Sequence, residues 1–238
     1  MVIAIIALLT AILVPSLSSA RIYANRSRCL SNLHNLGIAA ASYHSENGEF
    51  FWPFATYRPP ANPIYFWGSL DASGKLDTTV SPFMKHNGFN TGNLLCPAFP
   101  WGSYIPQAGA TEPTTTYAYN AWCLDPALWS RKDASGAKMT IRKVGTLQAP
   151  DRLFVFVDSC LRWSPGGVTV LQNSSSLDPV HGAWVQQPTT HFRHRELTNA
   201  LLADGHAASF DTEGGGMIMP KEKIGFVGTA NVPHYDDQ

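Results

Sequence analysis

The sequence predicts an α+β fold, in which one long N-terminal helix packs on a head built around an antiparallel β-sheet. Two observations lead to this prediction. An apolar segment continues into a single helical stripe over residues 1–48, and short apolar runs separated by Gly, Pro, Asn and Ser fill residues 49–238. A long helix followed by short strands is typical of α+β architecture. We therefore expect three segments, 1–20, 21–48 and 49–238.

The charge balance of the 238-residue chain limits its partners. Seventeen basic and 17 acidic residues give zero net charge, and only 14% of the residues are charged. A nucleic-acid-binding protein needs a basic face to neutralise phosphates, so we expect no nucleic-acid partner. The charges are also unevenly placed, because none occurs before Arg21.

Residues 1–20 form the first element, a helix that is apolar on all sides. Their sequence is MVIAIIALLTAILVPSLSSA, and twenty helical residues span about 30 Å, the thickness of a bilayer core. A secretory signal peptide is the alternative, but it would have a positive start, whereas here the first basic residues follow the segment. We expect a transmembrane or filament-core helix in which Pro15 is tolerated.

Residues 21–48 continue the same helix with one apolar stripe. Its members recur at helical spacing, and Gly48 is a plausible stop; they are Ile22, Cys29, Leu33, Leu36, Ala40 and Tyr43. The whole helix would be about 45 residues long, or roughly 65–70 Å. A lone membrane anchor needs no such stripe, so we expect the head to pack on it.

Residues 49–238 contain the expected strands of the head. Apolar runs bounded by turn residues predict strands at 116–123, 153–158, 168–171, 199–203, 206–210 and 223–227. Asp204-Gly205 predicts a two-residue type I′ hairpin turn, with Ala203 opposite His206 and Leu201 opposite Ala208. In this interpretation Asp204 and Gly205 are simply the turn.

A second interpretation gives some of these polar residues a metal. Asp158 ends a buried strand, and its carboxylate could bind a divalent ion together with two imidazoles and the turn carboxylate. The metal candidates are therefore Asp158, His194, Asp204 and His206. His191, three residues before His194, adds another imidazole. Each could equally be a hydrogen-bonded buried group. The sequence contains no nucleophile elbow, P-loop or HExxH motif, so we expect no enzyme and no other cofactor.

Four cysteines allow disulfides in an exported head. Cys29 lies on the apolar stripe and could join the helix to the head through Cys96, while Cys123 and Cys160 each end a predicted strand and could link to each other. Buried free thiols are the alternative. No two cysteines are close in sequence, so they do not indicate a zinc site.

Residues 50–67 form an aromatic, proline-interrupted loop. Its eight rings are Phe50, Phe51, Trp52, Phe54, Tyr57, Tyr65, Phe66 and Trp67. Such a loop could stack on sugar rings or bind a partner, because aromatic side chains offer large contact areas. The alternative is a satellite core folded over the sheet.

Several stretches of the chain resemble a known family. VIAIIALLTAILVPSLSSAR resembles the N-terminal helix of type IV pilins and type II secretion pseudopilins, and CLSNLHNLGIAAASYHSENGEF resembles one bacterial branch of pilin-like proteins. That branch has a C-terminal H-X9-DG signature, which His194, Asp204 and Gly205 match at residues 194–205. Its internal landmarks resemble Leu95-Cys96-Pro97, residues 116–120 and residues 156–159.

The resemblance implies a fold and a function. It implies a pilin-like fold and a non-enzymatic subunit anchored in the inner membrane, with an exported head. Such a subunit assembles with other pilin-like subunits, through dedicated machinery, into a type IV pilus or a type II secretion-like filament at the cell surface or in the periplasm. Family members have a basic leader, a glycine processing site and a glutamate, which alignment on VIAIIA places upstream of Met1. The alternative is a single-pass surface or periplasmic protein that does not polymerise and that binds glycan or another ligand through loop 50–67.

Overall fold

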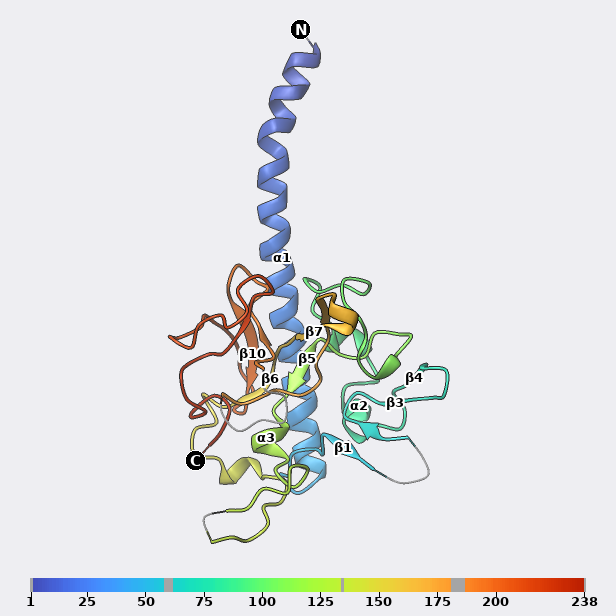
Figure 1. Cartoon of the computed structure of the whole chain (residues 1–238), viewed down its shortest axis with the longest axis vertical. Helices are drawn as coiled ribbons and strands as arrows, with labels where there is room; N and C mark the ends of the chain where they lie inside the picture. Colours follow the sequence, from blue (N-terminus) through green and yellow to red (C-terminus); the bar gives the residue numbers. More distant parts are fainter. Residues whose placement is uncertain (1, 58–61, 134, 181–186, 238) are drawn as a thin grey trace.

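The computed structural model describes residues 2–57, 62–133, 135–180 and 187–237. The C-terminal half of a long helix, α1 (Val2–Glu46), lies along the head, and its N-terminal half projects away from it (Figure 1). The C-terminus lies on the head, far from the N-terminus. The mixed helix and antiparallel sheet expected from the sequence is thus present.

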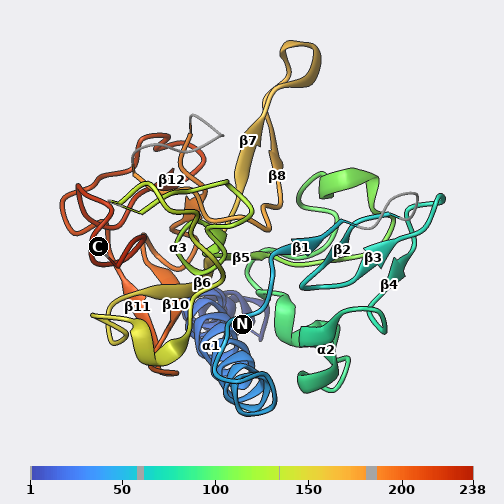
Figure 2. The ribbon, with the colours of Figure 1, turned by 90° about the horizontal axis from the view of Figure 1, so that it is seen from below.

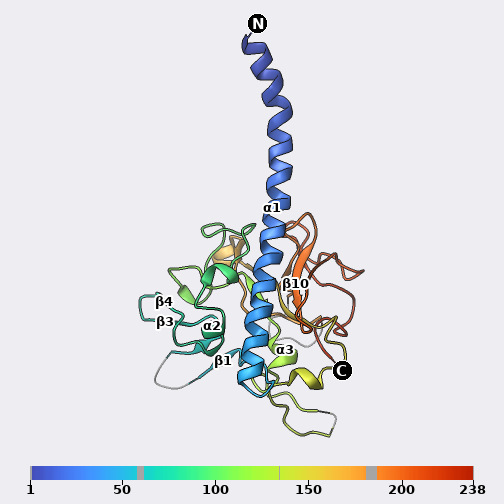
Figure 3. The same ribbon diagram turned by 180° about the vertical axis from the view of Figure 1, so that it is seen from behind.

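The C-terminal half of α1 packs on the head through the expected stripe. Cys29, Leu33 and Leu36 are fully buried, and Ala40 and Tyr43 are nearly so. Ile22 departs from the prediction, because it lies near the edge of the head and is 37% exposed. The helix ends where Gly48 adopts a left-handed conformation, φ 62°. Figure 2 shows the head on one side of α1, and Figure 3 shows α1 from the uncovered side.

The membrane expectation for residues 1–20 is not supported by the described residues. Within residues 2–57, 62–133, 135–180 and 187–237, no helix has the length and apolar character needed to span a bilayer. Much of that expectation rests on the side chains of residues 1, 2, 4–8 and 10, which lie outside the described set.

A four-stranded sheet forms the centre of the head. Its order is β11 (Ala207–Phe210), β10 (Thr198–Leu202), β6 (Phe154–Asp158) and β5 (Tyr117–Tyr119), with every neighbouring pair antiparallel. The expected strands at 153–158, 199–203 and 206–210 are therefore present within one residue at each end. Helix α1 contacts β10 and β11 directly.

Smaller elements surround this sheet. Four two-stranded pairs are described. The first two join β1 (Ala55–Thr56) to β2 (Ile64–Tyr65) and β3 (Ser69–Leu70) to β4 (Leu76–Asp77). The other two join β7 (Leu161–Trp163) to β8 (Val170–Gln172) and β9 (Thr190–His191) to β12 (Ile224–Gly225). Short helices are α2 (Pro82–His86) and α3 (Ala121–Leu124), with 3-10 turns η1 (Thr91–Leu94), η2 (Gln107–Gly109), η3 (Val144–Thr146) and η4 (Pro165–Gly167).

The predicted strand at 116–123 is too long. Strand β5 ends at Tyr119, and the Asn120 side chain accepts a hydrogen bond from the backbone N–H of Cys123 at 3.2 Å. This side-chain cap starts α3, because Asn satisfies an N–H that lacks a partner at a helix N-terminus. Cys123 therefore lies in a short helix and does not end a strand.

The hairpin between β10 and β11 also differs from the prediction. Leu201 pairs with Ala207, one residue away from the expected partner Ala208. The loop has three residues, because the Gly205 N–H donates to the Leu202 carbonyl and the Leu202 N–H donates to the His206 carbonyl. Of the two turn residues, only Gly205 has positive φ, 94°. A type I turn followed by a left-handed glycine fits this pattern better than a type I′ turn.

Candidate metal centre

Four buried side chains from four separate segments meet where α1 crosses the sheet. Cys29 comes from α1, Cys96 follows η1, Asp158 ends β6 and His194 follows β9. One ligand atom from each lies within 4.8 Å of those of the others. Each residue exposes 1% or less of its surface, so solvent does not reach the cluster.

The closest contacts in the cluster centre on His194. Its Nε2 lies 3.2 Å from Cys96 Sγ and 3.2 Å from Asp158 Oδ2. Cys29 Sγ lies 3.5 Å from Asp158 Oδ1 and 3.7 Å from Oδ2. All four ligand atoms therefore face a common centre.

Neighbouring residues hold the cluster in place. The Asn199 N–H donates to Asp158 Oδ2 at 2.9 Å, and the Thr116 hydroxyl accepts from the Cys96 N–H at 2.7 Å. The Tyr117 hydroxyl donates to Cys29 Sγ at 3.2 Å. Asp158 and Tyr117 are paired across β6 and β5, so the sheet register brings carboxylate and phenol together.

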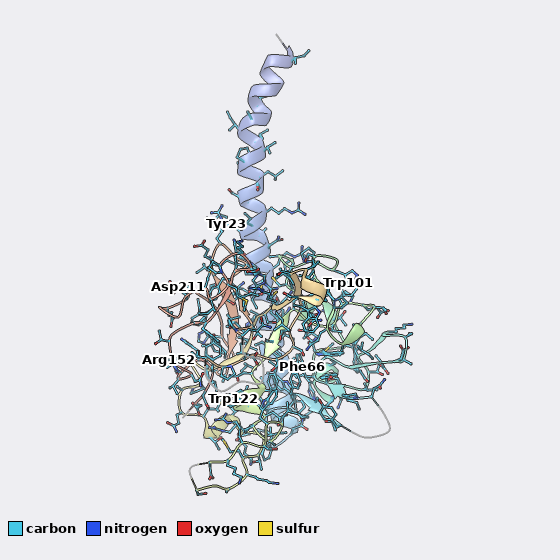
Figure 4. The ribbon with its side chains drawn as sticks, viewed as in Figure 1. Tyr23, Phe66, Trp101, Trp122, Arg152 and Asp211 are labelled. Carbon is cyan, nitrogen blue, oxygen red and sulfur yellow. The ribbon has the colours of Figure 1, made fainter. Side chains whose placement is uncertain are left out.

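His194 is positioned by a tight turn. Its N–H donates to the Leu197 carbonyl at 3.0 Å, and the reverse hydrogen bond is 3.3 Å. The two residues between them, Arg195 and Glu196, have left-handed φ values of 55° and 64°. This turn places His194 in the cluster and sends Arg195 outward, where it donates to the Tyr23 hydroxyl at 2.7 Å (Tyr23 is labelled in Figure 4).

Arg193 supplies a buried positive charge beside the cluster. Its Nε lies 3.6 Å from Asp158 Oδ1, its guanidinium lies over the Phe99 ring, and its Nη2 donates to the Ser159 carbonyl. Only 3% of the side chain is exposed. An ion pair this deeply buried loses its hydration, so it needs close partners on both sides.

The members of the cluster shift one another's pKa values. Burial opposes ionisation of Cys96, but hydrogen bonds from Cys29 and His194 lower the pKa of its thiol to about 6. Burial raises the pKa of the Cys29 thiol well above its usual value, with hydrogen bonding to Cys96 adding to the effect. Burial also opposes the charged form of His194, yet Asp158 and Cys96 raise the pKa of the imidazole to about 9.

The pKa of the Asp158 carboxyl is shifted as well. Burial would raise the pKa of its carboxyl, but the charge of Arg193 and the hydrogen bond from His194 lower it below the usual value. A thiolate and a carboxylate then face an imidazolium and a guanidinium. Thiolate, imidazole and carboxylate are also the donors that bind zinc in proteins.

The four residues expected to bind a metal separate into two pairs. Asp158 and His194 belong to the cluster. Asp204 and His206 instead contact each other, with Nδ1 of His206 2.7 Å from Oδ1 of Asp204, on an exposed turn. His191 is buried in β9 and is not a member of the cluster. The second pair therefore fixes the hairpin turn.

Neither disulfide expected from the sequence is formed. All four cysteines are buried free thiols. Cys29 and Cys96 do meet, as expected, but as members of the cluster. Cys123 packs in the main core, whereas Cys160 packs in a separate cluster with Phe99, Tyr104 and Ile224. Folding brings Cys29 and Cys96 together although they are 67 residues apart, so their distance in the sequence does not by itself exclude a shared metal.

Loop 50–67 contributes to the main core. Five of its eight rings are buried: Phe51, Trp52, Phe54, Phe66 and Trp67. Trp52 stacks on Tyr119 at 5.1 Å between ring centroids, and Phe66, which Figure 4 labels, is 1% exposed. These five rings are unavailable for stacking on a ligand, whereas Phe50 and Tyr57 stay 39% and 59% exposed. The loop is therefore mostly part of the core.

Comparison with known proteins finds no matching family model, no matching curated protein and no matching solved structure.

Proposed function

We propose that this chain is a non-enzymatic, pilin-like subunit that assembles with other subunits into a filament through the N-terminal half of α1. The observation that carries the proposal is the exposure of that segment, which lies outside the head (Figure 1). Its large apolar side chains that the structure describes are 54–84% exposed, namely Ile3, Leu9, Ile12, Leu13, Val14 and Leu17.

At 100° per residue, these side chains spread over about 200° of the helix circumference, with Ile12 at one edge and Val14 at the other. An apolar face this wide is stable only when it is covered by apolar material. A bundle of identical helices provides such surroundings and leaves each head on the outside of the assembly. The resemblance of residues 1–50 to pilin helices supports the same arrangement.

The proposal explains why one helix has two different halves. The half from Cys29 to Tyr43 buries a single stripe against the head, so the head is firmly attached to it. The other half is left for contacts between subunits. Storage of this half in a bilayer before assembly, expected from the resemblance, is a separate proposal that assembly itself does not require.

Matched charge substitutions test the proposal. Val14 in the projecting helix is 66% exposed, and Val168 on the head is 65% exposed. We expect the full chain to form filaments in electron micrographs when detergent is removed. Val14→Glu would place an unpaired carboxylate between packed helices, which costs several kcal/mol, so it should raise the concentration needed for assembly by at least about 100-fold. Val168→Glu should assemble normally.

Two results would contradict filament assembly. One is a chain with a folded head that stays monomeric at all concentrations after detergent removal. The other is equal assembly by Val14→Glu and the native chain, since the projecting helix would then lie outside the subunit contacts. If the monomeric chain floats with lipid vesicles and Val14→Glu does not, the segment is a membrane anchor and the filament proposal fails.

A further inference from the structure

We propose that Cys29, Cys96, Asp158 and His194 bind one Zn²⁺ ion, which fastens α1 to the head. This proposal concerns the joint between helix and head and holds whether or not the chain assembles into filaments. It rests on the positions, burial and chemistry of the four side chains.

The distances in the cluster match the edges of a zinc tetrahedron. With Zn–S bonds of about 2.3 Å and Zn–N or Zn–O bonds of about 2.0 Å, ligand atoms are separated by roughly 3.3–3.8 Å. The measured separations are 3.2 Å for both contacts of His194 Nε2, and 3.5 Å from Cys29 Sγ to the nearer Asp158 oxygen. The other ligand atoms lie within 4.8 Å of one another, so closing the tetrahedron requires shifts of at most about 1 Å.

The donor set selects the metal. Calcium and magnesium bind oxygen ligands, so a site with two sulfur atoms does not suit them. Two thiolates, one imidazole and one carboxylate form a four-ligand set of the kind that zinc takes with tetrahedral geometry. All four residues are buried, so no position is left open for water or substrate. A closed site of this kind is structural.

The charges around the site also suit a divalent ion. Two thiolates and a carboxylate carry three negative charges, which Zn²⁺ and the buried guanidinium of Arg193 would neutralise together. Arg193 Nε lies 3.6 Å from the Asp158 oxygen that His194 does not contact. The ion would therefore not leave an uncompensated charge in the core, which is the main cost of burying ionic groups.

The neighbours of the ligands resemble an outer coordination shell. Asp158 accepts the N–H of Asn199, and the Cys29 sulfur accepts the Tyr117 hydroxyl. Such hydrogen bonds orient ligands and typically change metal affinity 10–100-fold. The ligands come from α1, from the segment after η1, from β6 and from the turn after β9. One ion would thus connect four segments that are 36 to 67 residues apart in the chain.

Two other states of the cluster compete with zinc. Cys29 and Cys96 could form a disulfide in an oxidising compartment. The four groups could also remain a hydrogen-bonded cluster without an ion, since separations of 3.2–3.7 Å suit sulfur hydrogen bonds as well. The experiment must separate these three states.

The test measures metal in the full chain, purified in detergent under reducing conditions with ZnCl₂ in the growth medium. We expect one zinc per chain by elemental mass spectrometry. After chelation, CoCl₂ should restore the site and give intense sulfur-to-cobalt charge-transfer absorption, which indicates thiolate ligands.

The cysteines outside the cluster provide matched controls. Cys29→Ser and Cys96→Ser should each weaken zinc binding by more than about 100-fold, beyond the effect of an outer-shell residue. Cys123→Ser and Cys160→Ser change equally buried thiols and should keep one zinc per chain. His194→Gln should lose zinc, whereas His194→Cys should retain it, because thiolate is also a zinc ligand.

Each outcome decides the proposal. One zinc per chain, with thiolate–cobalt absorption lost only in variants of the four residues, would support it. Less than about one zinc per ten chains, with no cobalt absorption, would overturn it, whether peptide mass spectrometry then finds a Cys29–Cys96 disulfide or two free thiols. Metal content of the native chain is decisive even if a cluster variant does not fold.

Discussion

A Cβ atom added to Gly37 of α1 would lie 3.0 Å from the backbone carbonyl oxygen of Gly205. Gly205 is the last residue of the H-X9-DG segment, and His194, its first, lies in the cluster with Cys29. Cys29 and Gly37 are separated by eight residues, about 12 Å along the helix. The two ends of this segment therefore contact the same helix at two points, which gives both ends a structural role in holding α1.

We expect Gly37→Val to destabilise the head. A larger side chain must displace the Gly205 backbone and the Leu201 side chain, which would also lie 3.0 Å from the new Cβ. Overpacking of this kind costs typically about 1–3 kcal/mol, more than the few tenths of a kcal/mol gained in helix propensity. Ala41→Val, at an exposed position of the same helix, is the control and should cost no more than about 0.7 kcal/mol, the loss of helix propensity from Ala to Val. Urea unfolding measures both, and equal stabilities would show that the helix and turn can separate without cost.

The helix and the central strands could be predicted because their signals are local. The spacing of Leu33, Leu36 and Ala40 fixes the buried face of α1, and the apolar run at 153–158 gives β6. The end of β5 was missed because the Asn120 side chain caps a helix where the apolar pattern continues. The hairpin register was missed by one residue because the loop contains Ala203 as well as Asp204 and Gly205.

Only two of the four residues of the candidate site could be predicted as metal ligands from the sequence. Asp158 and His194 stood out as polar residues near strands, but Cys29 and Cys96 were interpreted as a disulfide. A ligand set drawn from four distant segments has no spacing pattern, unlike a zinc motif with two cysteines close together. The one available signal was that Cys29 lies on the buried stripe, which requires its thiol to point into the head.

We expect Tyr117→Phe to weaken zinc binding by about 10–100-fold while keeping one zinc per chain. The substitution removes only the hydroxyl that donates to Cys29 Sγ at 3.2 Å. Tyr119→Phe is the matched control, because it removes a hydroxyl that donates to the Trp52 carbonyl at 2.9 Å, two residues along the same strand. Competition with a zinc chelator measures both affinities. Equal effects of the two variants would mean that general loosening of the core, and not the bond to Cys29, controls the site.

We expect Asp237→Asn to destabilise the head by about 3 kcal/mol. Its side chain is fully buried, accepts the N–H groups of Gln148 and Ala149 at 2.9 Å, and lies 2.9 Å from Arg142 Nη2. An amide group would turn one acceptor into a donor and leave Arg142 without its anion. Asp151→Asn changes an exposed carboxylate 3.9 Å from Arg152, so it should cost under about 1 kcal/mol. Thermal unfolding of the two variants compares these costs, and similar losses would refute the role of burial.

We expect the stability of the head to depend on pH through Asp178. Burial raises the pKa of its carboxyl to about 7, and its Oδ2 has no hydrogen-bond partner among the described residues. Because the pKa of Asp178 is higher in the folded chain than in the unfolded chain, the folded chain binds the proton more tightly. Protonation of Asp178 therefore stabilises the folded chain, and this stabilisation is complete below about pH 4. It is lost as the pH rises to about 7, at about 1.4 kcal/mol for each pH unit.

Asp178→Asn keeps the shape of the neutral acid and cannot ionise, so it should match the native chain near pH 4 and exceed it in stability at pH 8. Urea unfolding at a series of pH values measures the difference, with Asp151→Asn as the exposed control. A difference between Asp178→Asn and the native chain that does not change with pH would show that the buried carboxyl does not titrate in this range.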